Sequence, residues 1–311
     1  KDVDGFRYDM AEMVPYEFWS YMNSAIKMKN PNAFLLAEVY NPNEYRNYIR
    51  LGKMDYLYDK VETYDYLKDV IQGRKLPDGL SNIQNGMKDI EHHMLHFLDN
   101  HDEQRLASPE FAGSGENGKP LMVISATLSS SPTMVYFGQE VGEAGNEYGG
   151  FGIHSRTSIF DYVGVPNHQR WMNGGKFDGA GLTEEQKNLQ AFYKGLLKFV
   201  NGSEAVQKGA FFDLQYIQGH DYDRRKVYSY LRYSENQKLV VVCNFDHFQE
   251  KNINLHIPDG AWTAMGLDPQ GNYTLKGVYE AKGPQKINAK DNISIKVAPN
   301  SAVIYEISSK K

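Results

Sequence analysis

Three short apolar runs, each closed by a carboxylate, lie in the first third of the chain. They are Gly5–Asp9, Leu35–Val39 with Glu38 near its end, and Phe97–Asp102, which includes His101. A run of this kind predicts a buried strand whose last residue meets solvent. In a parallel α/β barrel the carboxyl ends of the strands share one face. The pattern therefore predicts that Asp9, Glu38 and Asp102 gather in one site.

Strand-like and helical segments alternate up to about residue 205, which is typical of βα units and a parallel sheet. The expected strands are Val3–Asp9, Ala33–Val39, Asp55–Val61, Met94–Asp99 and Thr133–Phe137. The expected helices are Pro15–Lys29, Asn43–Leu51, Tyr64–Gln72, Leu80–Met94, Lys119–Ser129 and Thr183–Val200. A closed barrel needs eight strands. Because the sequence opens inside a strand motif, we expect a partial (β/α)8 barrel in residues 1–205, with the missing strands before it.

From about residue 206, short β-rich runs separated by turns replace the alternation of strand-like and helical segments. Such spacing predicts an antiparallel β-sandwich of Greek-key type over residues 206–311. Examples of these runs are Lys226–Tyr233, Lys238–Asn244, Asn252–Ile257, Ile293–Val297 and Ala302–Ile307. The sequence thus predicts two domains, with the boundary near Gly202–Gly209.

The residues at the strand ends suit acid–base and nucleophilic chemistry. Arg7 and Asp9 are two apart, so strand alternation places both on one face, where the guanidinium favours an ionised nucleophile. Glu38 ends the most apolar run, and a desolvated carboxyl suits a general acid. Each acid alone is typical of a solvated strand end. Together, in this order, they indicate the paired carboxylates that cleave glycosidic bonds.

These segments resemble the motifs of the α-amylase family, glycoside hydrolase family 13. Gly5–Ala11 resembles the fourth-strand motif, Leu36–Val39 the fifth and Phe97–Asp102 the seventh. Pro132–Glu140 resembles the motif of the eighth strand. The predicted helix Thr183–Val200 and the β-rich tail are similar to the last barrel helix and the C-terminal β-domain of the family, so the resemblance spans nearly the whole chain.

The resemblance implies a retaining α-glycoside hydrolase that acts on α-glucans such as starch or maltodextrin by double displacement. It implies Asp9 as nucleophile, Glu38 as general acid/base and Asp102 as transition-state stabiliser. Arg7 would orient Asp9, and His101 would bind the sugar. A transglycosylase of the same family and a non-catalytic carbohydrate-binding relative remain alternatives, and a fragment without strands one to three could be inactive alone.

The sequence departs from the family at two places. No third-strand motif precedes Asp9, so we expect an N-terminal barrel segment, in the same chain or another, to complete the fold. Met13 stands where many starch-degrading α-amylases carry a histidine. That residue shifts the resemblance toward neighbouring maltodextrin-acting subfamilies.

No cofactor is required for this chemistry, and no catalytic metal is expected. A structural calcium is possible, although most of its family ligands would lie in the missing N-terminal segment. His92 and His96 are four apart, but the segment departs from the zinc motif H-E-x-x-H. Cys243 is the single cysteine, which excludes a disulfide within the chain.

Charge and hydropathy narrow the partners further. A net charge of −5 argues against nucleic acid. No apolar run approaches the roughly 20 residues that a membrane span needs. The expected partners are therefore an α-glucan and the missing barrel segment. The sequence leaves the localisation open, with an extracytoplasmic, periplasmic or secreted protein favoured over a cytoplasmic one.

Overall fold

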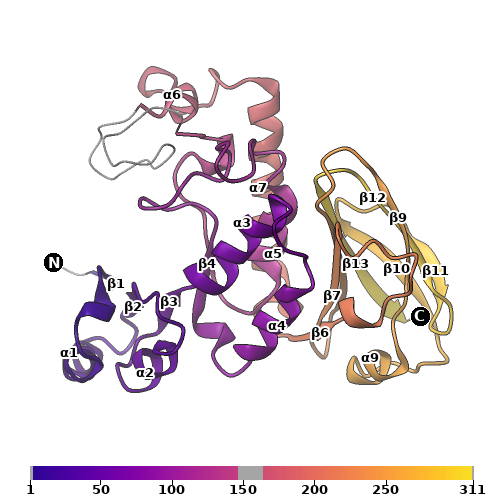
Figure 1. Ribbon diagram of the computed structural model, residues 1–311, viewed down its shortest axis with the longest axis horizontal. Helices are drawn as coiled ribbons and strands as arrows, with labels where there is room; N and C mark the ends of the chain where they lie inside the picture. Colours follow the sequence, from indigo (N-terminus) through magenta and orange to yellow (C-terminus); the bar gives the residue numbers. More distant parts are fainter. Residues whose placement is uncertain (1–2, 146–163, 310–311) are drawn as a thin grey trace.

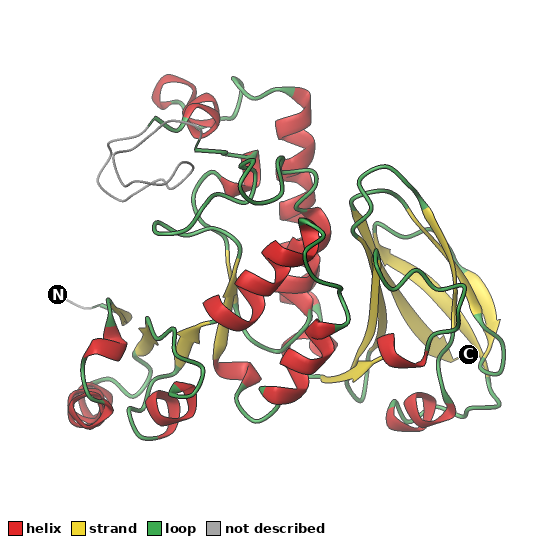
Figure 2. Ribbon diagram, viewed as in Figure 1, coloured by secondary structure: helices red, strands yellow, loops and turns green. Residues whose placement is uncertain are grey.

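A computed structural model describes residues 3–145 and 164–309. A parallel sheet with helices and an antiparallel β-domain lie side by side, with β1 at one end of the molecule and β11 at the other (Figure 1). Figure 2 shows helices between the two groups of strands. The predicted order, a parallel α/β part followed by an antiparallel β part, is confirmed in this coarse form.

The parallel sheet has the strand order β1-β2-β3-β4-β5, so that strands adjacent in sequence are adjacent in space. The strands are β1 (Gly5–Tyr8), β2 (Phe34–Ala37), β3 (Tyr56–Tyr58), β4 (Met94–Phe97) and β5 (Thr133–Met134). Gly5 lies so close to β2 that a Cβ there would fall 2.2 Å from the Phe34 carbonyl oxygen. In the register of the first pair, Tyr8 lies opposite Ala37. The residues that follow, Asp9 and Glu38, therefore leave the sheet side by side.

Helices connect and flank these strands. They are α1 (Tyr16–Lys29), α2 (Tyr45–Arg50), α3 (Asp65–Ile71), α4 (Gly79–Gly86), α5 (Lys119–Thr127), α6 (Pro166–Met172), α7 (Glu184–Gly202) and α8 (Glu204–Gln207). The helix α7 begins with the capping box expected from the sequence, in which Thr183 accepts a hydrogen bond from the Gln186 backbone. In Figure 1, α1 and α2 lie beside β1–β3, whereas α3, α4, α5 and α7 lie toward the β-domain.

The β-domain contains a six-stranded antiparallel sheet in the order β11-β10-β13-β8-β7-β6 and the two-stranded pair β12-β9. Its strands are β6 (Ala210–Asp213), β7 (Val227–Tyr233), β8 (Lys238–Asn244), β9 (Lys251–Leu255), β10 (Asn272–Tyr279), β11 (Gln285–Asn288), β12 (Ile293–Val297) and β13 (Ser301–Ser309). The helix α9 (Asp259–Ala264) covers one end, and its Trp262 is fully buried in the domain core.

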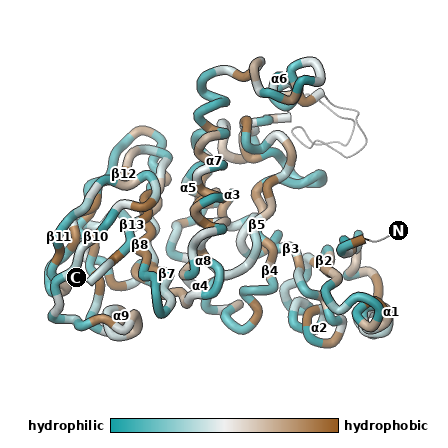
Figure 3. Tube along the Cα trace, turned by 180° about the vertical axis from the view of Figure 1, so that it is seen from behind, coloured by the Kyte–Doolittle hydropathy of each residue, from teal (hydrophilic) through white to brown (hydrophobic). Residues whose placement is uncertain are grey.

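One hydrophobic core joins the two parts. It combines α5 residues such as Leu121 and Ile124 with Tyr228, Val241 and Ile304 from the facing sheet. Hydrophobic colours follow α5 and the adjacent strands in Figure 3. Two buried hydroxyl pairs, Ser81 with Tyr228 at 3.2 Å and Thr127 with Tyr230 at 2.6 Å, cross the same junction. A shared core of this kind fixes the β-domain against the parallel sheet.

Three predicted elements differ from the structure. The strand expected over Asp55–Val61 ends at Tyr58, and a π-helix follows over Lys60–Tyr64. The helix expected over Leu80–Met94 ends at Gly86 and is followed by a 3₁₀ turn at Glu91–His93, because the chain must turn into β4. The strand expected over Thr133–Phe137 ends at Met134. There Gly138, with φ of 81°, turns the chain back, and the Gln139 side chain accepts a hydrogen bond from the Tyr136 backbone.

Candidate active site

Asp9 and Glu38 follow neighbouring strands at the carboxyl edge of the parallel sheet. The Glu38 backbone N–H donates to the Tyr8 carbonyl oxygen at 3.0 Å, which continues the β1–β2 ladder one step past the strands. The Met10 backbone N–H donates to Glu38 Oε2 at 2.7 Å. Met10 itself has a positive φ of 43°. The tight turn after Asp9 therefore brings a backbone donor to the Glu38 carboxylate.

Arg7 links the two carboxylates. Its Nη1 atom donates to Asp9 Oδ1, and its Nη2 atom lies 3.2 Å from Glu38 Oε2. The Asp9 side chain is 70% exposed, whereas that of Glu38 is 11% exposed. Burial alone would lower the pKa of Arg7, but the hydrogen bonds to Asp9 and Tyr58 and the charge of Glu38 leave that pKa raised. A permanent cation thus stands between an open and an enclosed carboxylate.

Glu12 fastens the turn after Asp9 to the segment after Glu38. Its Oε2 atom accepts hydrogen bonds from the backbone N–H groups of Tyr40 at 2.8 Å and Asn41 at 3.0 Å. The buried Tyr48 hydroxyl, on α2, donates to the carbonyl oxygens of Glu12 and Val14. Sequence reasoning missed Glu12, although its place three residues after Asp9 was a signal.

The third acidic segment follows β4. His101 Nε2 lies 2.9 Å from Asp102 Oδ2, and the Asp102 side chain is 42% exposed. Asn100 holds this turn, because its Oδ1 atom accepts the backbone N–H groups of Asp102 at 2.9 Å and Glu103 at 2.8 Å. The structure thus pairs His101 with Asp102 on the same edge of the sheet that carries Asp9 and Glu38.

The Tyr40 hydroxyl interacts electrostatically with Glu38, which follows β2, and with Asp102, which follows β4. Burial raises the pKa of this hydroxyl, and the charges of Glu38, Glu103 and Asp102 raise it further. The Lys60 ammonium lies 6.0 Å from the centroid of the Tyr40 ring and 3.6 Å from Glu103 Oε1. Tyr40 therefore stands within reach of both Glu38 and Asp102. Strand alternation, which puts Tyr40 on the same side as Glu38, could have identified it from sequence.

The described residues provide no ligand set for a metal ion. In residues 3–145 and 164–309 no three His, Cys, Asp or Glu side chains come together in a way that could hold one. His96 is buried in β4, where Nδ1 contacts the Ser125 carbonyl oxygen and Nε2 lies 3.4 Å from Asp59. Within the same ranges, no helix has both the length and the hydropathy to cross a bilayer.

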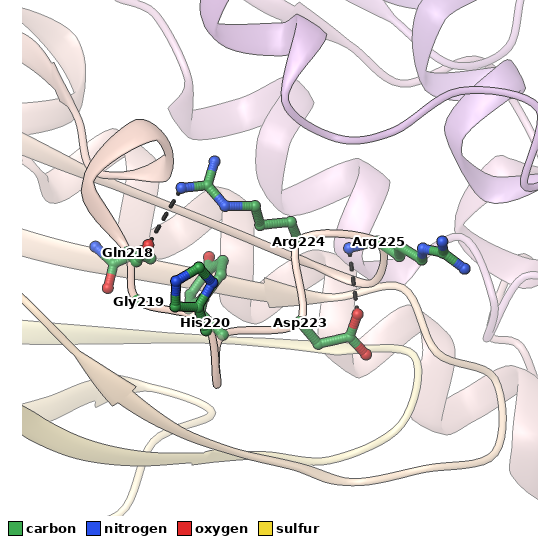
Figure 4. Close-up of a pocket in the computed structure, with 7 residues that line it drawn as sticks. Gln218, Gly219, His220, Asp223, Arg224 and Arg225 are labelled. Atoms are coloured by element: carbon green, nitrogen blue, oxygen red, sulfur yellow. Dashed lines mark hydrogen bonds between the residues drawn. The ribbon is translucent and has the colours of Figure 1, made fainter.

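A separate hollow of about 470 Å³ is lined by the segment that connects β6 to β7. Figure 4 shows Gln218, His220, Arg224 and Arg225 around it, with Arg224 donating to the Gln218 carbonyl oxygen at 3.2 Å. None of Asp9, Glu38 or Asp102 lines it. The candidate active site is therefore the carboxylate edge of the parallel sheet.

Two family profiles together cover most of the chain. The profile described as "Alpha amylase, catalytic domain" matches residues 1–225. The profile described as "Alpha amylase, C-terminal all-beta domain" matches residues 216–308. All three carboxylates of the site lie within the first match.

Curated relatives match at low identity. A cyclomaltodextrinase from a Bacillus species is 23% identical over 251 residues, which is 78% of this chain and 39% of that protein. The α-amylase MalA of Haloarcula japonica is 27% identical over 251 residues, which is 78% of this chain and 31% of that protein. An intracellular maltogenic amylase of Bacillus subtilis is 25% identical over 45% of this chain and 24% of its own length. The chain spans well under half of these relatives.

Solved structures match over the whole chain. The α-amylase of Geobacillus thermoleovorans, crystallised in complex with acarbose, superposes with a TM-score of 0.73 at 18% identity, covering 100% of this chain and 61% of that one. An Anoxybacillus α-amylase gives a TM-score of 0.67 at 19% identity, covering 100% of this chain and 60% of that one. These similarities show a shared fold.

Proposed function

The chain belongs to the α-amylase family of glycoside hydrolases, and from this premise we propose that the complete protein is a retaining hydrolase of α-glucans. The observation that carries the proposal is the bridge from Arg7 to both Asp9 and Glu38. It places one exposed and one enclosed carboxylate side by side, as a nucleophile and a general acid require.

In the first step, Glu38 donates its proton to the glycosidic oxygen while the Asp9 carboxylate attacks the anomeric carbon. The bond to the leaving sugar breaks, and a β-glycosyl ester with Asp9 forms. In the second step, ionised Glu38 takes a proton from water, whose oxygen displaces Asp9 and restores the α-configuration. Asp102 stabilises the positive charge that develops on the sugar ring, and His101 donates a hydrogen bond to a sugar hydroxyl.

The test follows the anomers released from a maltooligosaccharide by NMR. We expect the α-anomer to appear first, ahead of mutarotation. Initial β-anomer would exclude the double displacement. Longer oligosaccharides as the main product would favour the transglycosylase, in which a sugar hydroxyl replaces water. Binding of the oligosaccharide without turnover would favour the non-catalytic relative.

We also propose that β1 is completed by further barrel strands. In the described residues β1 pairs only with β2. A hollow of about 400 Å³, lined by residues 4–7 and Phe34, opens along it, and Phe6 is 40% exposed. An uncovered edge strand with apolar side chains favours association. The greater length of the relatives supports a barrel segment as the natural cover, in the same chain or another.

The 311-residue polypeptide alone is therefore expected to self-associate through this edge. Phe6→Lys should shift its sedimentation profile toward monomer, because a charge on an edge strand opposes pairing. Phe248→Lys is the matched control, since Phe248 is 89% exposed but lies in the β-domain. A wild-type polypeptide that stays monomeric at high concentration and melts cooperatively would contradict the proposal.

A further inference from the structure

A buried ion pair connects the two ends of the loop that carries His101 and Asp102. Asp99 accepts a hydrogen bond from the Leu106 backbone N–H, and this bond joins the two ends of the loop. Arg105 Nη1 lies 3.2 Å from Asp99 Oδ2, and both side chains are 0% exposed. Asp99 and Arg105 thus precede and follow Asp102 in the sequence, and neither side chain contacts solvent.

Arg105 also fixes the loop to the next strand of the sheet. Its Nη1 atom donates to the Phe137 carbonyl oxygen at 2.7 Å. The guanidinium lies over the Tyr136 ring at 4.6 Å and over the Phe137 ring at 4.8 Å. Because these residues follow β5, Arg105 sets the position of the loop relative to the carboxyl end of that strand. A lysine lacks the planar guanidinium that lies over these two rings.

Side chains that follow β3 contact the same loop at Glu103 and Gln104. Lys60 lies 3.6 Å from Glu103 Oε1, Lys68 Nζ donates to Gln104 Oε1 at 2.8 Å, and the Tyr64 hydroxyl donates to the Gln104 carbonyl oxygen at 3.3 Å. These three side chains belong to the π-helix Lys60–Tyr64 and to α3, which follow β3. The loop is therefore held between the elements that follow β3 and those that follow β5.

A buried ion pair contributes little net stability, because the cost of desolvating both charges offsets their attraction. The Asp99–Arg105 pair instead fixes geometry. We propose that Asp99 and Arg105 are positioning residues that hold Asp102 where it acts in the transition state. This inference rests on the proposed function, because it assigns a task to residues that serve Asp102.

The charge of Asp99 adds a pH dependence to the pair. Burial raises the pKa of Asp99 to about 7, with Arg105 and the Leu106 N–H opposing the shift and Glu143 adding to it. Among the described residues, the charge of Asp99 also acts on the hydroxyls of Tyr64 and Tyr193, which stay neutral because burial raises their pKa values. Asp99 is thus ionised and paired at pH 8, whereas at pH 6 it is largely protonated and holds Arg105 more weakly.

We expect Asp99→Asn to lower kcat on a maltooligosaccharide by about 10²-fold at pH 8, the effect of a small misplacement of a catalytic group. KM should change less than about twofold, because Asp102 acts mainly in the transition state. The ratio of wild-type to variant kcat should shrink between pH 8 and pH 6, as wild-type Asp99 itself becomes protonated. An unchanged kcat, or a ratio independent of pH, would overturn the proposal.

The matched control is Asp246→Asn in the β-domain. Asp246 also caps a loop, because its carboxylate accepts the backbone N–H groups of Phe248 and Gln249 at 3.0 Å and contacts Lys251 at 2.9 Å. It lies outside the parallel sheet and its site. Its removal should leave kcat and its pH profile unchanged, whatever it does to the melting temperature.

A double-mutant cycle separates positioning from general stability. If Asp99 acts through Asp102, Asp99→Asn should have little further effect on kcat in an Asp102→Ala background. Equal effects in both backgrounds would show that Asp99 acts independently of Asp102 and would overturn the proposal.

Hydrogen exchange tests the loop without any assay of activity. In Asp99→Asn and in Arg105→Lys, backbone exchange over residues 101–106 should rise at least tenfold, while exchange in β8 stays as in wild type. If exchange rises in these variants but the wild-type protein has no turnover, the result would count against the proposed function. It would still support the positioning of the loop by Asp99 and Arg105. Arg105→Lys is the milder variant and serves as the test if Asp99→Asn fails to fold. Unchanged exchange over residues 101–106 in Arg105→Lys would refute the positioning role of Asp99 and Arg105.

Discussion

The Asp9→Asn variant is expected to lose turnover of α-1,4-linked maltooligosaccharides, with kcat lowered by on the order of 10⁴-fold or more, as when other covalent catalysts lose a member of their nucleophilic machinery. An amide cannot form the glycosyl ester on which the double displacement depends. The Asp9 side chain is largely exposed beside Arg7 and is not part of a packed core. The substitution keeps the shape of the side chain, so folding and sugar binding should survive.

Two measurements check this result in the complete protein. Calorimetric titration with a maltooligosaccharide should give a Kd within severalfold of the wild-type value, and progress curves should give kcat. Asp89→Asn provides the control, because Asp89 is a partly exposed carboxylate paired with Arg46 and Arg50 at the molecular surface. Near-normal turnover by Asp9→Asn would remove Asp9 from the role of nucleophile.

The placement of the carboxylates was predictable because it follows from strand geometry. Once the runs ending near Asp9, Glu38 and Asp102 are taken as parallel strands, their carboxyl ends must share one edge. Alternation along β1 also put Arg7 on the face of Asp9, where the structure places its guanidinium. These inferences need only local patterns and the rule that parallel strands end together.

Contacts between segments distant in sequence were not predictable. Nothing near Arg105 indicates that its guanidinium lies over the Tyr136 and Phe137 rings, because that contact depends on how the β4 and β5 loops meet. The strand β10 was not among the runs named from the sequence, although buried Tyr273 and Leu275 alternate there with polar residues, which is a strand signal. In the structure it pairs with β13.

The Glu38→Gln variant is expected to discriminate between substrates by their leaving groups. Glutamine cannot donate a proton, so cleavage of a maltooligosaccharide, whose sugar alkoxide departs poorly, should slow by about 10²- to 10⁴-fold. An aryl α-maltoside with an acidic phenol needs little protonation, so its first step should proceed at nearly the wild-type rate. The burst of phenol release in a stopped-flow experiment measures that step directly. Equal losses on both substrates would contradict an acid role for Glu38.

The same variant should also stall after the burst, because no base remains to deprotonate water in the second step. Azide is a nucleophile that needs no deprotonation, so it should restore turnover of the aryl maltoside. It must approach from the face opposite Asp9, and the product should therefore be the α-glycosyl azide. A β-glycosyl azide would mean direct displacement without the ester. Glu38 is held in its enclosed position by the Met10 N–H and Arg7. The amide introduced by Glu38→Gln can still accept the backbone hydrogen bond, but it has no acidic proton to give. The variant can therefore separate the two steps without moving the side chain.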